Sequence, residues 1–109
     1  METYIVLMKM TEKGLNEISK IPAFIESLEQ KFTELNGELK GFYKTMGEID
    51  YVSLFVAPDD KVALSFVMAF GFSKYFKTTT LKCYPITEME KSLEIFSSHL
   101  KWSKADKRS

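Results

Sequence analysis

The sequence predicts an α+β domain: a four-stranded antiparallel sheet, built in the order βαββαβ, with its long helices on one face and a further C-terminal helix. Four short runs rich in β-branched and aromatic residues alternate with segments whose apolar residues recur every three or four positions. The two middle runs follow each other directly, as in a hairpin. The 109 residues suffice for one core, so we expect a single domain over residues 1–102 and a polar, flexible tail over residues 103–109.

The first third of the chain is predicted to form a strand and then an interrupted helix. Tyr4–Met10 is a nearly continuous apolar run, which is typical of a strand covered on both faces. The hydroxyl of Thr11 can cap the following helix, whose end is predicted at Asn36-Gly37. Pro22 lacks an amide proton and crowds the preceding turn, so we expect a short helix, a kink and a longer helix. The apolar residues at helical spacing are Leu15, Ile18, Ile25, Leu28, Phe32 and Leu35.

The middle of the chain is predicted to form a hairpin. Its strands are expected over Glu38–Met46 and Asp50–Ala57, and both faces of the second are apolar. Gly47 lies at the bend between them, where we expect a positive φ because glycine has no Cβ to clash.

The last third is predicted to form a helix, a strand and a helix. Pro58-Asp59-Asp60 places a proline and two carboxylates at the start of a helix that is expected to stop near Gly71 and to be buried nearly all round. Tyr75–Tyr84 is the fourth strand. Thr87 and Glu90 have the spacing of a capping box at the start of the last helix. The apolar residues of that helix are Ile86, Met89, Leu93, Phe96 and Leu100.

This order is that of a ferredoxin-like fold, in which both long helices cover one face of the sheet. Successive strand side chains alternate between faces, so Tyr4 or Ile5, Tyr43, Tyr51, Phe55 and Tyr75 cannot all point at the helices. We expect about half of this set to line the other, open face. A monomer rarely exposes so large an apolar patch. We therefore expect a homo-oligomer, most simply a two-fold dimer with sheets packed face to face, with larger assemblies also open.

Charge and cysteine content exclude several classes of protein. Fifteen basic and fifteen acidic side chains balance, so the chain lacks the basic face of a nucleic-acid-binding protein. Cys83 is the single cysteine and, with His99, cannot supply a structural zinc site, so we expect no metal and no cofactor. The N-terminal apolar run is too short for a signal peptide or a membrane span, and we expect a cytoplasmic protein without membrane contact.

Several short motifs spread over most of the chain carry a family resemblance. They are Tyr4-Ile5-Val6-Leu7-Met8-Lys9 with Thr11 and Gly14, Gly41-Phe42-Tyr43, Gly47-Glu48 with Asp50, Ala57-Pro58-Asp59-Asp60, and Thr80-Leu81. In these motifs the chain resembles the GYD domain family, named for a Gly-Tyr-Asp signature. Ile49 stands where the family usually has Tyr, and Gly71-Phe72-Ser73-Lys74 lacks a second glycine expected before the last strand. The resemblance implies a ferredoxin-like fold of the dimeric α/β-barrel kind, found in bacteria and archaea, and implies no particular reaction.

Four residues are candidates for a ligand site: Lys9, Tyr43, Asp50 and Tyr51. Asp50 can bond backbone amides of the turn, or act as a general base if it is partly desolvated. Tyr43 and Tyr51 can present phenols to a pocket or pack in an interface. Lys9 can hold an acidic ligand, pair with an acid of the hairpin, or reach solvent.

These candidates favour a non-catalytic oligomeric module that binds a small, partly apolar ligand in a cavity at the sheet and subunit interface. One alternative is a metal-independent enzyme of the oxygenase or isomerase kind, by analogy of fold alone. Another is a purely structural oligomer. The sequence identifies no catalytic residue.

Overall fold

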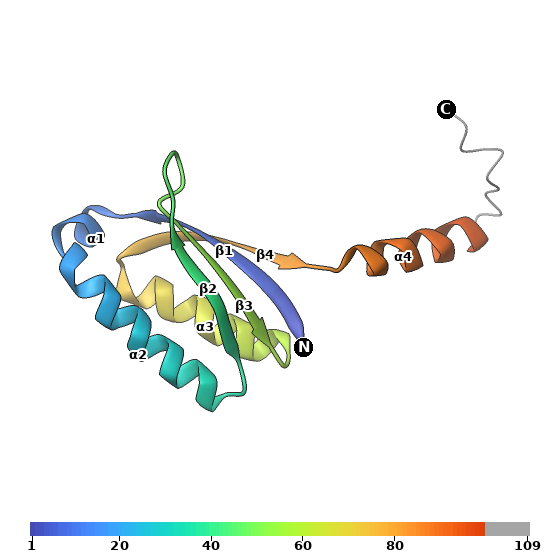
Figure 1. The fold of residues 1–109 in the computed structure, drawn as a ribbon, viewed down its shortest axis with the longest axis horizontal. Coiled ribbons are helices and arrows are strands. Elements are labelled where there is room, and N and C mark those ends of the chain that lie inside the picture. The colour runs from blue at the N-terminus through green and yellow to red at the C-terminus, as the bar shows by residue number, and fades with distance from the viewer. Residues whose placement is uncertain (100–109) are drawn as a thin grey trace.

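Four antiparallel strands form one sheet in the order β2-β3-β1-β4, with two long helices on one of its faces (Figure 1). This architecture comes from a computed structural model, which describes residues 1–99. The strands are β1 (Glu2–Met10), β2 (Glu38–Lys44), β3 (Tyr51–Ala57) and β4 (Phe76–Cys83). The helices are α1 (Glu12–Asn16), η1 (Ile18–Lys20, a 3-10 turn), α2 (Ile21–Glu34), α3 (Asp60–Ser73) and α4 (Ile86–His99). The predicted α+β, ferredoxin-like fold is confirmed.

The strand register divides the sheet into a face that meets the helices and a face that does not. Tyr4 lies opposite Phe55 of β3, and both are buried beneath α2 and α3. The next residue, Ile5, lies opposite Leu54 and points to the other side. We call that side the open face; its apolar residues, all partly or largely exposed, are Ile5, Leu7, Tyr43, Val52, Leu54, Val56 and Leu81.

Aromatic rings fill the space between the sheet and the helices. The ring of Phe55 is fully buried and lies 5.1 Å from that of Tyr4, 5.4 Å from that of Phe32 and 4.6 Å from that of Phe66. These contacts join β1, β3, α2 and α3 at one point. Both aromatic residues of β3, Tyr51 and Phe55, therefore face the helices, and the open face of this strand is aliphatic.

The predicted starts of α1 and α3, the predicted break at Pro22 and the predicted bend are confirmed. The Thr11 hydroxyl accepts a hydrogen bond from Gly14 N (3.1 Å) at the start of α1. Pro22 stands in the first turn of α2, after the short α1 and the 3-10 turn, so the expected break is present. Gly47 has a φ of +118°. The Asp59 carboxylate caps α3 by accepting from Val62 N (2.9 Å).

The burial and the end of α3 and the start of α4 differ from the prediction. Helix α3 is not buried all round, because Leu64, Met68 and Phe72 are exposed. Helix α3 continues through Gly71 to Ser73 and ends at Lys74, which takes a left-handed φ of +61°. The Ser73 hydroxyl supports this end by donating to Phe70 O (2.6 Å). Helix α4 already begins at Ile86, so Thr87 lies inside the helix and does not cap it. Leu100 and the predicted tail fall outside the described residues.

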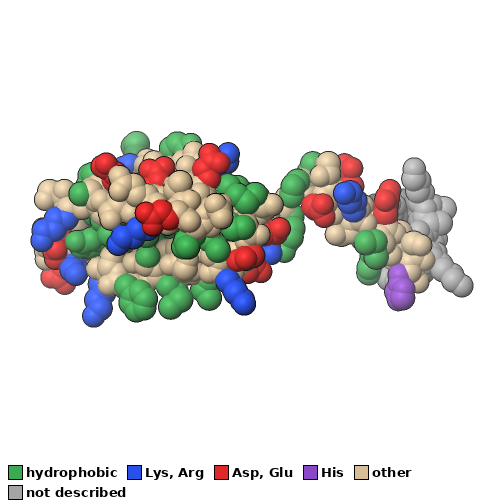
Figure 2. All heavy atoms as spheres, turned by 90° about the horizontal axis from the view of Figure 1, so that it is seen from below, with side chains coloured by type: hydrophobic (Ala, Val, Ile, Leu, Met, Phe, Trp, Pro, Cys, Tyr) green, Lys and Arg blue, Asp and Glu red, His purple; other side chains and the backbone are tan. Residues whose placement is uncertain are grey.

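Helix α4 extends away from the sheet, in line with β4 (Figure 1). None of its described residues is buried, and its hydrophobic side chains lie on the surface (Figure 2). We call the row formed by Ile86, Met89 and Leu93 the α4 seam; all three are exposed. The predicted helix is present, but the described part of the chain does not cover its apolar side.

Candidate functional site

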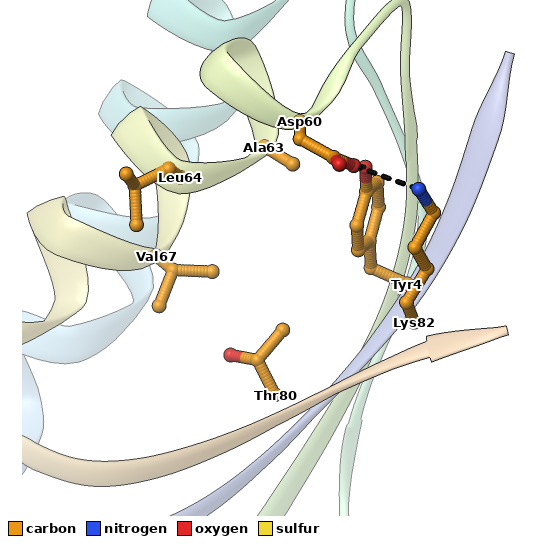
Figure 3. Close-up of a pocket in the computed structure, with 7 residues that line it drawn as sticks. All are labelled: Tyr4, Asp60, Ala63, Leu64, Val67, Thr80 and Lys82. Carbon is orange, nitrogen blue, oxygen red and sulfur yellow. Dashed lines mark hydrogen bonds and ion pairs between the residues drawn. The ribbon is translucent and has the colours of Figure 1, made fainter.

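A hollow of about 270 Å³ lies on the helix side of the sheet, between α3 and the strands β1 and β4 (Figure 3). Its wall on α3 is apolar, and its polar groups lie at the end near the start of α3 and along β4. The lining residues are Tyr4, Asp60, Ala63, Leu64, Val67, Thr80 and Lys82. The hollow thus combines a hydrophobic side with a charged end, a combination that is common in small-molecule sites.

Three residues from separate elements meet at the charged end of this hollow. Tyr4 and Lys82 are direct neighbours in the β1–β4 register, and Asp60 is the first residue of α3. The Tyr4 hydroxyl and the Lys82 ammonium both donate to Asp60 Oδ1, the latter at 3.0 Å. Lys82 Nζ also lies 3.3 Å from a Glu2 carboxylate oxygen. We call Tyr4, Asp60 and Lys82 the Tyr4–Asp60–Lys82 cluster.

Each member of the cluster is held in one protonation state. Burial, followed by the hydrogen bond to Asp60, raises the pKa of Tyr4 to about 12. The hydrogen bond from Tyr4 lowers the pKa of Asp60, and the hydrogen bond to Asp60 raises the pKa of Lys82. At neutral pH the phenol is therefore neutral and the other two groups are charged. Because none of the three titrates near pH 7, the cluster suits the binding of a polar group better than general acid–base catalysis.

We expect Tyr4 to titrate at a higher pH than the ordinary tyrosine value of 10.0. The phenol loses its proton at about pH 12 in the folded protein and near its ordinary value of 10.0 in the unfolded chain, so Tyr4 contributes stability below pH 10 that disappears as the pH rises toward 12. Tyrosinate absorbance at 295 nm during an alkaline titration should show one delayed transition. Tyr4→Phe should remove it, whereas the control variant Tyr43→Phe should leave it in place. A titration without a delayed component would contradict this result.

Two of the four candidate residues from the sequence, Lys9 and Tyr43, lie on the open face. Lys9 Nζ is 3.8 Å from a Glu48 carboxylate oxygen, and both side chains are exposed. Tyr43 is 57% exposed on β2, and its hydroxyl would lie only 2.5 Å from a Cβ placed on Gly41. Gly41 therefore lets the Tyr43 ring lie flat along its own strand.

Asp50 and Tyr51 lie elsewhere. Asp50 Oδ2 accepts a hydrogen bond from Met10 N (2.7 Å), and its backbone N donates to Met8 O (2.9 Å), so Asp50 ties the hairpin to the end of β1. The Tyr51 ring points toward the helices and packs against Phe76. Lys44 contacts both, 3.8 Å from Asp50 Oδ1 and 4.9 Å from the centre of the Tyr51 ring. The structure thus brings Asp50 and Tyr51 together, but on the other side of the sheet from Tyr43.

Two further observations concern the described residues as a whole. Within residues 1–99, no three His, Cys, Asp or Glu side chains gather in a way that could hold a metal ion. In the same range, no helix combines the length and the apolar composition needed to cross a membrane.

Comparison with known proteins found a match to one family model. The model, described as the GYD domain, matches residues 4–93, from Tyr4 in β1 to Leu93 in the middle of α4. The matched range therefore includes the whole hollow and every open-face residue. A search of the curated proteins found no match.

Proposed function

The chain belongs to the GYD domain family, and from that premise we propose that it is a small homo-oligomeric protein that binds a small, partly apolar ligand where its subunits meet. The open face carries this proposal. Its centre is aliphatic across β1 and β3, from Ile5 and Leu7 to Val52 and Leu54. A continuous apolar surface of this kind on a soluble domain is typical of an interaction site.

A second copy of the chain is the natural cover for this surface. Two aliphatic sheet faces can interdigitate at a separation of about 10 Å, as in other face-to-face sheet packings. A two-fold axis between them makes the contact closed, so that it does not propagate into a filament. In such a pair the apolar centre is buried, and the residues around it form the edge of the interface.

The ligand position follows from the polar residues around that centre. Tyr43 on the edge strand β2 and Lys9 near the end of β1 border the aliphatic residues of the open face. In the paired arrangement, a phenol and an ammonium group would line the space at the edge and orient a partly apolar ligand. Asp50 and Tyr51 support the site from the other side, because they hold the hairpin that carries Tyr43.

Native mass spectrometry of the purified protein tests this proposal. We expect an even number of 12.6 kDa subunits and the mass of a retained small molecule. Leu54→Lys places a charge in the centre of the open face, so it should shift the protein to single subunits and release the molecule. Ser27→Lys, a matched change on an exposed position of α2, should leave the assembly intact.

Two results would contradict the proposal. A wild-type protein that is a single subunit at every concentration would remove the interface and, with it, the site. A small molecule that stays bound to single Leu54→Lys subunits would show that its site does not need the interface.

A further inference from the structure

We infer that α4 docks on the outer side of α3 in a second copy of the chain. The first reason is the state of α4 itself. Its 14 residues form a helix whose α4 seam is exposed, and isolated helices shorter than about 12–15 residues are marginal in water. The helix therefore depends on a surface that covers Ile86, Met89 and Leu93.

Helix α3 carries a row of exposed apolar side chains whose length is similar to that of the α4 seam. Leu64, Met68 and Phe72 follow one another at intervals of four residues and are 57%, 47% and 78% exposed. We call them the α3 row. At a rise of 1.5 Å per residue, the α3 row is about 12 Å long and the α4 seam about 10 Å long. Two such rows can pack as neighbouring helices do, with the side chains of one between those of the other.

The charges around the two rows are complementary. Glu90 follows Ile86 by four residues and precedes Leu93 by three, so it lies beside the α4 seam. Glu94 lies one turn further on, and neither glutamate forms an ion pair with a residue in the range 1–99. On α3, Lys61 lies on the side of Leu64, and Lys74 follows the last turn. A glutamate beside the seam can thus face a lysine at one end of the α3 row. The carboxylate next to Lys61, that of Asp60, is already paired with Tyr4 and Lys82.

The groove between α2 and α3 is a less suitable surface. It has a volume of about 190 Å³ and is lined in part by Leu28, Lys31 and Leu35. However, α2 carries three glutamates, Glu26, Glu29 and Glu34, against the single Lys31. Because α4 likewise carries three glutamates and one lysine, the two helices would repel each other.

The connection to β4 favours a second copy over the same chain. Only Tyr84 and Pro85 separate the end of β4 from the start of α4, and α4 continues away from the sheet (Figure 1). To reach its own α3, the helix would have to reverse direction within two residues, one of which is a proline with a fixed φ. An arm that leaves its own domain in this way can instead be exchanged between two copies.

Disulfide trapping between different chains tests the inference. In a Cys83→Ala background, one chain carries Met68→Cys and the other Leu93→Cys, with distinguishable tags, and the two are co-expressed and mildly oxidised. Both positions are exposed, so the fold should be unaffected, which circular dichroism melting would verify. We expect a disulfide-linked dimer that contains both tags. Ile95 is exposed on the opposite side of α4, so Ile95→Cys in place of Leu93→Cys should reduce the linked fraction at least tenfold.

Three results would overturn the inference: no mixed dimer, equal trapping by Ile95→Cys, or a Met68→Cys, Leu93→Cys double variant that links only within one chain. The inference shares with the proposed function the premise that copies associate, but it concerns a different surface. Adding Leu54→Lys to the trapping variants distinguishes the α4 contact from pairing through the open face. A mixed dimer that persists in this variant supports the α4 contact even if the open face proves not to pair. Loss of trapping in chains that still associate through the open face removes only the α4 contact.

Discussion

Replacing Phe55 by alanine is expected to lower the free energy of unfolding by about 3–5 kcal/mol, the range observed when a fully buried aromatic residue is truncated. Phe55 is completely buried, and its ring contacts those of Tyr4, Phe32 and Phe66. Its loss would leave a cavity where two strands and both long helices meet. At roughly 4–8 °C per kcal/mol for a domain of this size, the melting temperature should fall by more than about 10 °C.

Urea unfolding followed by circular dichroism measures this change. Met46→Ala is the matched control, because Met46 is fully exposed in the bend of the hairpin, and surface substitutions usually change stability by less than about 0.5 kcal/mol. A Phe55→Ala variant as stable as the control would show that the aromatic cluster is not the centre of the core.

Gly14→Ala is expected to cost about 1–3 kcal/mol by overpacking. A Cβ at this buried position would lie 2.3 Å from Tyr75 O, a backbone atom that cannot rotate away. The same carbonyl already accepts a hydrogen bond from Thr11 N (2.9 Å), and the Thr11 hydroxyl donates to Lys74 O (2.5 Å). The start of α1 is therefore fixed against the turn before β4, and the added methyl group would force the two apart.

Gly71→Ala is the control, because it is expected to change the free energy of unfolding in the opposite direction. Gly71 lies inside α3, and a Cβ placed there has no atom within 4 Å apart from its chain neighbours and the backbone of its own helix. Alanine should therefore raise the free energy of unfolding by about 0.5–1 kcal/mol through its higher helix propensity. Thermal melts of both variants provide the comparison, and a Gly14→Ala protein at least as stable as wild type would show that α1 is not fixed in this way.

Local chemistry predicted most of the fold from the sequence. Proline at position 22 restricts φ, glycine at position 47 tolerates a positive φ, and the carboxylate at position 59 is favourable at a helix start; all three act as expected. The end of α3 was missed because glycine is a common helix terminator, yet here Lys74 takes the left-handed conformation. Such a conformation is unfavourable for lysine alone, and the sequence does not show the tertiary contacts that hold it.

The charged end of the hollow could not be predicted from the local chemistry of single residues. Asp60 is 56 residues from Tyr4 and 22 residues from Lys82, and the three meet only because the register of β1 and β4 aligns Tyr4 with Lys82. A shift of one residue would send Lys82 to the open face. The sequence identified Asp60 as a residue at a helix start, but its partners depend on that register. Of the four residues that the sequence singled out for a ligand, Lys9 and Tyr43 lie on the open face and stay candidates for the interface, whereas Asp50 and Tyr51 support it from the other side.

The position of β1 in the sheet affects how the protein folds during synthesis. This strand is made first among the four, but its neighbours are β3 and β4, which begin at Tyr51 and Phe76. At about 5–20 residues per second, a ribosome needs several seconds to produce the second neighbour. During that time the apolar β1 segment has an unpaired edge, so the nascent chain is most prone to aggregation before residue 83 is complete.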